Sequence, residues 1–204
     1  MVTFGVTLLS GGLDSTVVTA YAKERCDNLT AITFFYGQSH SKEVCCAQDI
    51  ASLLGIKHKL VDISFLRQIA WYSSLTNTTA FPVPKNGGVN IEKGVPITYV
   101  PLRNTIFLSI SAAYLESQVL YSIEHEEVPP EDVQIWLYMA PNTIDYSGYP
   151  DCRPEFFDQV EKALRYGSKI GSEYGLEVHI DTPIIRMSKS EIVNMGTRLK
   201  APLG

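Results

Sequence analysis

The sequence predicts an α/β fold: a doubly wound parallel sheet with helices on both faces. Apolar runs of strand length alternate with segments of helical period along most of the chain. A glycine turn between the first strand and the first helix has the form that such sheets use to bind anions. The length of 204 residues suits one compact domain with a sizeable core. We therefore expect residues 1–204 to form a single domain.

The first half of the chain reads as strand, helix, strand, helix, strand. The expected elements are a strand over 2–9, a helix over 14–25, a strand over 29–36, a helix over 41–55 and a strand over 59–63. This alternation predicts parallel strands joined by right-handed crossovers. Ligands of such sheets bind beyond the carboxyl ends of the strands, so the loops at Ser10, Gly37 and Ser64 should share one rim.

The second half begins with a break in the pattern, because prolines, glycines and asparagines crowd residues 73–98. A loop of this length is usually a lid, a substrate loop or disorder. Further elements follow: a helix after Asn104, a solvated acidic stretch over 124–132, a strand over 134–139, one helix over 154–172 and a strand over 176–180. Ser188 and Glu191 form the pattern of a capping box at the start of a last helix.

Composition narrows the class of protein. With 45% hydrophobic and 19% charged residues the chain is neither disordered nor membrane-spanning, and no apolar run approaches the roughly 20 residues of a membrane helix. The 17 basic and 22 acidic residues give a net charge of −5, which disfavours nucleic acid as a partner. Cys26, Cys45, Cys46 and Cys152 lack metal-site spacing and suit free thiols. No export signal is visible, so we expect a cytoplasmic protein without nucleic-acid or membrane partners.

The segment Ser10-Gly11-Gly12-Leu13-Asp14-Ser15 directly follows the first predicted strand. Unpaired N–H groups at a helix start and the positive end of the helix dipole favour anions there. The two glycines permit close approach of the backbone to phosphate. The segment lacks the lysine of a Walker A loop, and it lacks the Gly-x-Gly-x-x-Gly pattern of a dinucleotide fingerprint. The alternative is an ordinary turn in which Asp14 or Ser15 is a helix N-cap.

This Ser-Gly-Gly-x-Asp-Ser pattern resembles the pyrophosphate loop (PP-loop) of the N-type ATP pyrophosphatases, which split ATP between the α and β phosphates. The resemblance implies the adenine-nucleotide alpha-hydrolase-like fold, an ATP site and Mg²⁺. The residues expected to bind ATP are Leu8, Leu9, Ser10, Gly11, Gly12, Leu13, Asp14, Ser15, Thr16, Val17, Val18, Gly37, Gln38 and Lys189. Asp14 is the candidate for an indirect contact with Mg²⁺ or for ordering the loop, and the alternative for Lys189 is a solvated helix lysine.

Four separated segments, residues 9–15, 36–38, 100–105 and 145–156, together resemble the 7-cyano-7-deazaguanine synthases. These enzymes make the nitrile precursor of queuosine and archaeosine. The resemblance implies an ATP-dependent ligase that converts 7-carboxy-7-deazaguanine and ammonium into the nitrile through adenylated intermediates, releasing AMP and pyrophosphate. A homodimer is also expected.

A deazaguanine ring needs a carboxylate or carbonyl acceptor and aromatic faces for stacking. The residues expected to bind the substrate are Arg103, Asn104, Asp145, Tyr146, Tyr149, Asp151 and Arg153, and those expected to act in catalysis are Asp14, Ser15 and Arg103. Alternatives stay open for three residues: Arg103 as a surface ion-pair partner, Asn104 as a helix cap, and Cys152 as a packed thiol rather than a nucleophile.

The chain departs from the family in three places. Phe35 stands where the family usually has an aspartate, and Ala140-Pro141 replaces the usual Gly-Val before Asn142. The resemblance also implies a zinc ion held by four cysteines of a tail; no cysteine here matches them, so no metal ligand is assigned. A truncated chain is expected, and the alternative is a family member without the tail. One rival is a tRNA-thiolating PP-loop enzyme, which needs further cysteines and a basic surface. The other is a non-catalytic ATP-binding regulator, which needs no segment like 145–156.

Overall fold

A computed structural model describes residues 1–36, 41–81, 94–142 and 148–203. Its sheet has five strands in the order β3-β2-β1-β4-β5, and every neighbouring pair is parallel. The strands are β1 (Val2–Leu8), β2 (Asn28–Phe35), β3 (Lys57–Asp62), β4 (Val133–Tyr138) and β5 (Val178–Asp181). The parallel sheet and the five predicted strands are confirmed, with ends that differ by at most two residues.

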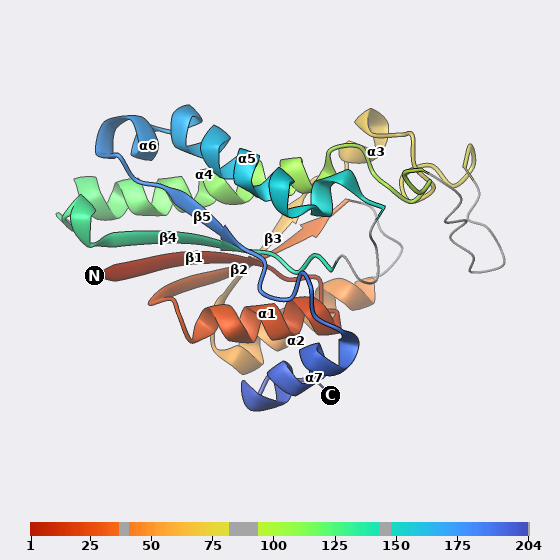
Figure 1. Ribbon diagram of the computed structural model, residues 1–204, viewed down its shortest axis with the longest axis horizontal. Helices are drawn as coiled ribbons and strands as arrows, with labels where there is room; N and C mark the ends of the chain where they lie inside the picture. The colour runs from red at the N-terminus through yellow and green to blue at the C-terminus, as the bar shows by residue number, and fades with distance from the viewer. Residues whose placement is uncertain (37–40, 82–93, 143–147, 204) are drawn as a thin grey trace.

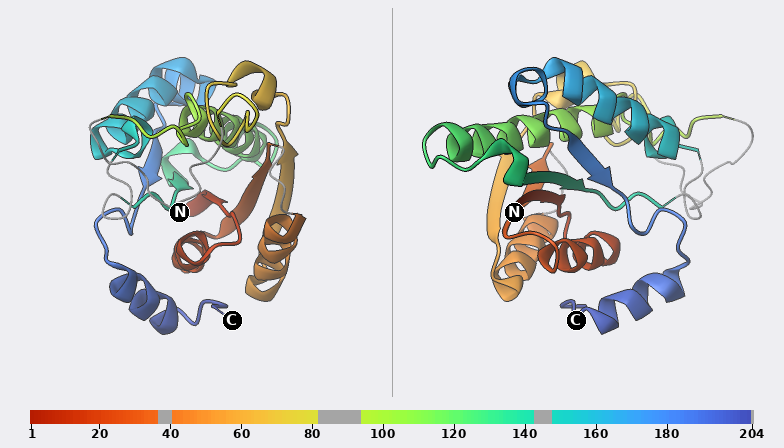
Figure 2. Two further views of the ribbon diagram at one scale, coloured as in Figure 1. Left: turned by 90° about the vertical axis from the view of Figure 1, so that its right-hand side faces the viewer. Right: turned by 60° about the vertical axis from the view of Figure 1, so that its left-hand side comes forward.

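Helices cover both faces of the sheet, as predicted for a doubly wound fold (Figure 1). One face carries α1 (Leu13–Lys23), α2 (Ser41–Leu54) and α7 (Lys189–Arg198). The other carries α4 (Arg103–Glu124), α5 (Pro154–Gly167) and α6 (Lys169–Tyr174). The remaining helical segments are the short α3 (Leu66–Ile69) and the 3₁₀ turns η1 (Pro130–Asp132) and η2 (Pro150–Cys152). Figure 2 shows the two helical layers on either side of the twisted strands.

The largest core cluster lies between the sheet and α4. Val6 and Leu137 of the central strands are fully buried, as are Leu108 and Val119 of α4. Branched and aliphatic side chains on a strand buried on both faces explain why these segments read as continuous apolar runs. This packing fixes α4 against the sheet, and α4 supplies one wall of the site described below.

Helix α4 corrects one expectation from composition. It has 22 residues, and an 18-residue window within it has a mean hydropathy of 1.3, so by length and composition it is apolar enough to cross a membrane. A core helix of a soluble protein passes the same test. Here its apolar face packs on β1 and β4, while hydroxyls at Ser109 and Ser117 donate to carbonyls of the preceding turn. The apolar pattern of this helix is therefore explained by its place in the core.

The single helix predicted over 154–172 is wrong, because the chain breaks it at Ser168. Ser168 has an extended conformation (φ −115°, ψ 155°), and its hydroxyl accepts the N–H of Gly171 at 3.1 Å. A Cβ atom at Gly171 would lie 1.9 Å from the carbonyl oxygen of Arg165, so the break requires glycine there. Two helices, α5 and α6, result.

The predicted capping box at the start of α7 is confirmed. The Ser188 N–H donates to the Glu191 carboxylate at 2.7 Å, and the Ser188 hydroxyl accepts the Glu191 N–H at 3.4 Å. Farther along α7, a Cβ atom at Gly196 would lie 2.7 Å from a Val17 methyl, so α7 lies tightly against α1. The cap and this close packing together place Lys189 at the start of α1.

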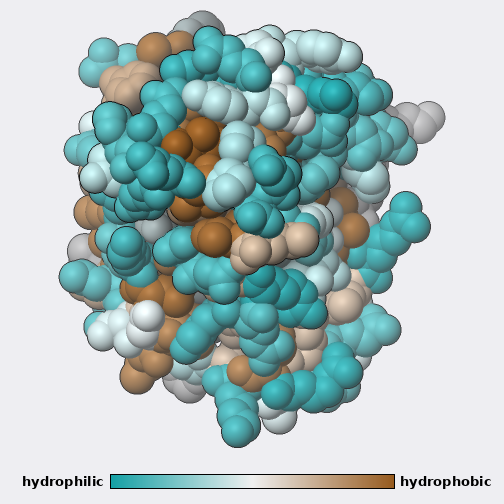
Figure 3. Space-filling view, turned by 90° about the vertical axis from the view of Figure 1, so that its left-hand side faces the viewer, coloured by the Kyte–Doolittle hydropathy of each residue, from teal (hydrophilic) through white to brown (hydrophobic). Residues whose placement is uncertain are grey.

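The strand order predicts where a ligand binds. Successive strands leave β1 in one direction, toward β2 and β3, and after α4 the chain returns to the other side of β1 as β4. Loops that leave β1 and β4 therefore separate at the carboxyl ends of these strands and open a crevice. The opposite end of the sheet shows mostly hydrophilic side chains with scattered apolar ones (Figure 3).

Candidate active site

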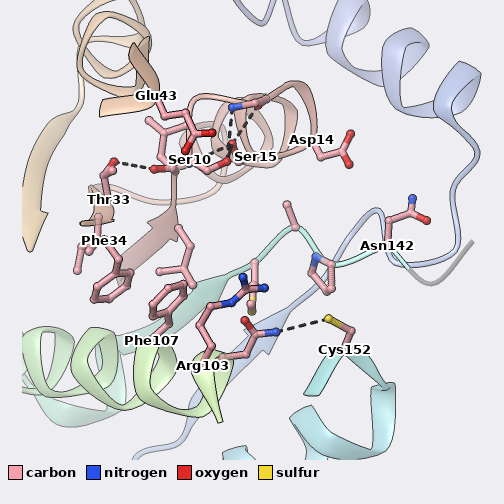
Figure 4. A pocket seen from close by; sticks show the side chains of 18 of the residues that line it. Ser10, Asp14, Ser15, Thr33, Phe34, Glu43, Arg103, Phe107, Asn142 and Cys152 are labelled. Carbon is pink, nitrogen blue, oxygen red and sulfur yellow. Dashed lines mark hydrogen bonds between the residues drawn. The ribbon is translucent and has the colours of Figure 1, made fainter. Parts of the chain in front are cut away.

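A cavity of about 490 Å³ lies at this crevice, between the carboxyl ends of β1 and β4. One wall is the loop that leaves β1 together with the first turn of α1, and the opposite wall is the start of α4 together with η2 (Figure 4). The predicted site residues that line it are Leu8, Leu9, Ser10, Gly12, Leu13, Asp14, Ser15, Arg103, Asn104, Tyr149 and Lys189. Segments that are far apart in the sequence thus meet at one site.

The two glycines of the loop have different tasks. Gly11 has φ +85°, and a Cβ atom there would lie 2.8 Å from the carbonyl oxygen of Glu43 on α2. Gly11 is therefore required by backbone conformation and by close packing. A Cβ atom at Gly12 would meet only the Ser10 hydroxyl, at 3.6 Å. The space beside Gly12 is open to the cavity, so this is where a ligand can approach the backbone.

The loop is held by its own hydroxyl groups. The Ser15 hydroxyl donates to the Gly12 carbonyl at 3.0 Å and accepts the Ser10 N–H at 3.2 Å. Because its one hydrogen is used, the Ser10 hydroxyl is the donor in the 3.0 Å contact between Ser10 and Ser15. The first intrahelical bond runs from the Thr16 N–H to Gly12, which leaves the first-turn N–H groups of α1 available to an anion.

A contact from the neighbouring strand β2 also supports the loop, and it was not predicted. The Thr33 hydroxyl on β2 donates to the Leu9 carbonyl at 2.6 Å and lies 2.8 Å from Nε2 of His58 on β3. Since that hydroxyl has already used its hydrogen, Nε2 of His58 is the donor to Thr33. Burial lowers the pKa of His58, which favours the neutral ring. A threonine inside an apolar strand was the one available signal in the sequence.

Lys189 reaches the loop from the far end of the chain. Its Nζ lies 2.8 and 3.0 Å from the two carboxylate oxygens of Asp14, across 175 residues. Both side chains line the cavity and both are partly exposed. The pair therefore places one cation and one carboxylate beside the loop.

Arg103 leads the opposite wall, and its side chain points into the cavity (Figure 4). Its Nε is buried and makes no hydrogen bond to any residue that the structure describes. The guanidinium carbon lies 6.0 Å from the centre of the Phe107 ring, at the edge of cation–π range. A buried guanidinium donor with no partner is suited to a ligand carboxylate or phosphate.

Asn104, which lines the cavity, is hydrogen-bonded to Asp151 behind it. The Asp151 carboxylate accepts the backbone N–H of Asn104 at 3.2 Å, and the Asn104 amide donates to the Asp151 carbonyl at 2.9 Å. Asp151 is buried and is not among the residues lining the cavity. Burial raises the pKa of the Asp151 carboxyl, which the Asn104 N–H and the nearby Arg103 charge oppose. Helix capping, the alternative left open for Asn104, thus falls to Asp151.

Cys152 lines the cavity as a buried thiol. Burial, with the neighbouring Asp151 charge, raises its pKa to about 11. The Asn104 amide donates to its sulfur at 3.4 Å. At neutral pH the group is a thiol rather than a thiolate, which favours the packing role over the nucleophilic one.

The other predicted residues fall into three groups. Tyr149 lines the cavity, and its hydroxyl lies 2.6 Å from that of Thr98. The residues that do not line the cavity are Gly11, Thr16, Val17, Val18, Asp151 and Arg153. The Thr16 hydroxyl donates to the Gly12 carbonyl at the start of α1. Arg153 is exposed at the start of α5. The predicted residues that lie outside the described ranges are Gly37, Gln38, Asp145 and Tyr146. The individual roles of all these residues stay predictions.

An aromatic and apolar surface between the two walls was also not predicted. Phe34 and Phe107 stack at 4.3 Å with nearly parallel rings, and Tyr36 lies beside Phe107 at 6.0 Å. All three line the cavity, together with Met139 and Pro141 after β4. Their ring faces suit a purine-like ligand. In the sequence these side chains are indistinguishable from core residues.

A metal centre has no ligand set in the described ranges. No group of three or more His, Cys, Asp and Glu side chains there lies close enough together to hold a metal ion. Cys45 and Cys46 are exposed on α2, far along the chain from buried Cys152. The zinc that the resemblance implies therefore has no site among these residues, and no reaction step is assigned to it.

Structural comparison supports the fold class alone. An NH₃-dependent NAD synthetase from Campylobacter jejuni matches with a TM-score of 0.52 and 18% identity, over 98% of this chain and 65% of that one. A 4-thiouridine synthetase, solved with RNA and bound ATP, matches with a TM-score of 0.50 and 14% identity, over 98% of this chain and 41% of that one. These proteins share the parallel sheet with flanking helices, and the predicted fold class is confirmed.

Sequence comparison is more specific. The family model described as "Queuosine biosynthesis protein QueC" matches residues 5–204. Proteins named 7-cyano-7-deazaguanine synthase from Thermoplasma acidophilum and Ralstonia pickettii are 43% and 40% identical, over 97% and 98% of this chain and 74% and 80% of their own lengths. The predicted family is confirmed: the chain belongs to the QueC family, whose relatives here are named 7-cyano-7-deazaguanine synthases.

Proposed function

We propose that the protein is an ATP-dependent ligase that converts 7-carboxy-7-deazaguanine and ammonium into 7-cyano-7-deazaguanine. The observation that carries this proposal is one cavity with two separate places for negative charge, the loop at Gly12 and, opposite it, Arg103 with its buried Nε. The relatives' name supplies the product. The family match favours this activity over the tRNA-thiolating enzyme and over the non-catalytic regulator.

ATP belongs on the loop wall. The open space at Gly12 lets a phosphate approach the backbone. The donors that its oxygens need are the first-turn N–H groups of α1 and the Lys189 ammonium. Asp14 would hold Mg²⁺, because its partly exposed carboxylate lines the cavity and offers the oxygen ligands that this ion prefers. The ion would shield the phosphate charges.

The substrate carboxylate belongs on the Arg103 wall. A carboxylate is a poor acylating agent, since its leaving group would be oxide. When its oxygen bonds to the α-phosphorus of ATP, the bond to the β-phosphate oxygen breaks and pyrophosphate leaves. Arg103 holds the carboxylate and neutralises charge as this happens, so positioning and electrostatics carry the step. Ammonia then bonds to the acyl carbon, AMP leaves, and one proton is released to give the neutral amide.

A nitrile requires the loss of the second oxygen as well. The amide oxygen bonds to the α-phosphorus of a second ATP, and pyrophosphate leaves again. The carbon–oxygen bond then breaks, AMP carries the oxygen away, and the nitrogen loses both protons. Two ATP are therefore converted to two AMP and two pyrophosphate for each nitrile. The Phe34 and Phe107 rings offer faces for the planar ligands throughout.

One experiment tests the reaction and its stoichiometry. The protein is incubated with 7-carboxy-7-deazaguanine, ¹⁵N-ammonium and ATP with Mg²⁺, and the products are weighed by mass spectrometry. We expect the nitrile with one ¹⁵N atom and, by phosphorus NMR, about two AMP for each nitrile under positioning-based phosphoryl chemistry. Formation of the nitrile together with ADP, instead of AMP, would contradict the adenylation mechanism but not the substrate assignment. Absence of the nitrile, with ATP bound, would contradict the substrate assignment.

The finer statements on partners stay part of this proposal. The family supports a small-molecule substrate. Ammonium, a homodimer and a cytoplasmic location are expectations from the sequence. Sedimentation of the purified protein at several concentrations tests the dimer. A single species at the monomer mass of 22.7 kDa would contradict it.

A further inference from the structure

The Arg103 wall depends on a joint between two distant segments. Three hydrogen bonds connect the first turn of α4 to η2, 47 to 48 residues later: the Asn104 N–H to the Asp151 carboxylate, and the Asn104 amide to the Asp151 carbonyl and to the Cys152 sulfur. Asn104 and Asp151 are only 2% and 5% exposed. Bonds shielded from water to this degree hold the two segments in one arrangement.

This joint sits next to the residue that faces the ligand. Leu102 turns the chain into α4 with φ +55°, a left-handed conformation that is uncommon for a residue with a side chain. Arg103 follows and points into the cavity (Figure 4). The direction of the Arg103 side chain is therefore set by a strained turn on one side and by the bonds of Asn104 on the other.

Asp151 also acts on Arg103 by its charge. Burial raises the pKa of the Asp151 carboxyl, and the Arg103 charge is one of the effects that oppose this rise, so the two groups influence each other. Yet the carboxylate oxygen bonds to the helix backbone, and the buried Nε of Arg103 makes no hydrogen bond to a described residue. A negative charge at the start of α4 stabilises the helix and leaves the guanidinium donor open to a ligand.

From this geometry we propose that Asp151, through Asn104, is a positioning residue that fixes Arg103 for the substrate carboxylate and does not itself contact the substrate. The inference rests on the proposed function, because the ligand of Arg103 is taken to be the carboxylate of that substrate. A guanidinium binds a carboxylate in a planar, two-bonded arrangement, so its direction matters. A displacement of about 1 Å in such a site lowers the rate by roughly 100-fold.

A double-mutant cycle tests this directly, with kcat/KM for the deazaguanine acid measured in Asp151→Ala, Arg103→Ala and the double variant. We expect Asp151→Ala to lower kcat/KM by about 10- to 100-fold, with the affinity for ATP within about twofold of wild type. In the Arg103→Ala background the same change should cost less than about twofold, because the residue acts through Arg103. If the fold-losses in kcat/KM of the two single variants multiply in the double variant, the proposal is overturned, since a direct contact with the substrate or a general loss of structure would give that result.

Two further variants keep the cycle decisive. Asp151→Asn retains an oxygen that can accept the Asn104 N–H but removes the charge, and we expect a folded protein with a smaller loss. It replaces Asp151→Ala if that variant does not fold. Glu155→Gln is the matched control, because Glu155 is an exposed carboxylate in the first turn of α5. If Arg103→Ala has no measurable turnover, the affinity for the acid, measured by calorimetry, replaces kcat/KM for the wild type, both single variants and the double variant.

A spectroscopic measurement separates this inference from the proposed function. The Arg103 Nε–H, assigned in ¹⁵N NMR by its loss in Arg103→Ala, should exchange slowly in wild type and become averaged in Asp151→Ala and Asn104→Ala. An unchanged Arg103 resonance in both variants would overturn the positioning role whatever the activity. If the wild-type protein forms no nitrile, but its Arg103 resonance becomes averaged in Asp151→Ala and Asn104→Ala, the proposed function is overturned and the positioning role stays intact.

Discussion

The two walls of the cavity are built in different ways. The loop wall is one continuous segment, and the hydrogen bonds of Ser10, Gly12 and Ser15 that hold it join residues two to five positions apart. The Arg103 wall joins α4 to η2 and residue 98 to residue 149, through contacts across 47 to 51 residues. The internal hydrogen bonds of the first wall are local, although Thr33 on β2 and Lys189 on α7 also contact it, whereas the hydrogen bonds of the second wall join segments that are distant in the sequence.

This difference has a functional counterpart. The loop wall offers backbone donors, which recognise phosphate in any nucleotide. The Arg103 wall offers side chains whose directions are set by tertiary contacts, and selection of a particular acid requires such groups. The fold is shared with a protein named NAD synthetase at 18% identity, so the sheet itself does not decide the substrate. We expect substitutions on the two walls to separate ATP binding from substrate use.

The largest effect should come from Arg103→Ala. Among the residues that the structure describes, Arg103 is the guanidinium that lines the cavity, and in the proposed reaction it holds and neutralises the substrate carboxylate. We expect kcat/KM for the acid to fall by about 100- to 1,000-fold, the usual cost of losing a preorganised charge-stabilising donor. The affinity for ATP, measured by calorimetry, should stay within about twofold. Equal losses in both measurements would mean that the walls do not divide the two ligands.

The glycine pair should divide stability from binding within the loop wall. Gly11→Val forces a side chain into a left-handed conformation and against Glu43, so we expect the free energy of unfolding to fall by about 1–3 kcal/mol or more and ATP binding to be lost. Gly12 has φ −83° and ψ 163°, an extended conformation that valine adopts readily. Gly12→Val should therefore fold normally and lose ATP affinity alone.

Urea denaturation and calorimetric titration of both glycine variants give this comparison. Gly12→Ala is the control, because its added methyl group meets only the Ser10 hydroxyl at an ordinary distance. A folded Gly12→Val protein with wild-type ATP affinity would contradict the assignment of ATP to this loop.

Sequence reasoning succeeded where structure is local. The Ser10–Ser15 loop and the Ser188 capping box each follow from residues within a few positions of one another, and the structure contains both. The parallel sheet follows from the alternation of strands and helices along the chain. The strand order was not predicted, because hydrophobic periodicity identifies strands but does not say which of them are neighbours. The break at Ser168 was missed because the apolar period continues across it.

In the site, the misses are the tertiary contacts. Asp151 is predicted to bind the substrate because it lies in a polar segment that resembles the family, and that role stays a prediction. The contact that sequence reasoning missed is the hydrogen bond that its carboxylate accepts at the start of α4. Thr33 and His58 belong to two different strands, and only their pairing across the sheet shows that they support Leu9. Residue type indicates which chemistry is available, but the partner of a buried polar group is decided by the fold.

The support beneath the loop should be sensitive to pH. Burial lowers the pKa of folded His58 below its ordinary value of 6.5, so the unfolded chain binds the proton first as pH falls. The contribution of His58 to stability is therefore present above pH 6.5 and is lost as pH falls through the lower, folded-state value. We expect the urea midpoint to drop between pH 7.5 and pH 5.5, and to drop less in His58→Gln, whose amide can still donate to Thr33.

Buried carboxyls do not confuse this measurement. Burial raises the pKa of Asp151 and of Asp181, so their contributions are lost as pH rises rather than as it falls. They are also present in both proteins and cancel in the difference between wild type and His58→Gln. An identical pH dependence of the two midpoints would show that His58 is not the group responsible.

The smallest effect should come from Cys152, although it lies beside Arg103 in the cavity. A thiol nucleophile would have to ionise, and with a pKa of about 11 roughly one Cys152 side chain in a thousand is a thiolate at pH 8. The adenylation sequence needs no thiol, because AMP already serves as the leaving group. We expect Cys152→Ser, in which a hydroxyl replaces the thiol that accepts from Asn104, to keep kcat within about threefold of wild type.

Alkylation followed by peptide mass spectrometry should modify the exposed Cys45 and Cys46 long before Cys152, with turnover retained while Cys152 is unmodified. A folded Cys152→Ser protein that binds both ligands but has lost turnover by 100-fold or more would make this thiol a participant in the reaction, and would move covalent chemistry onto the wall assigned here to positioning.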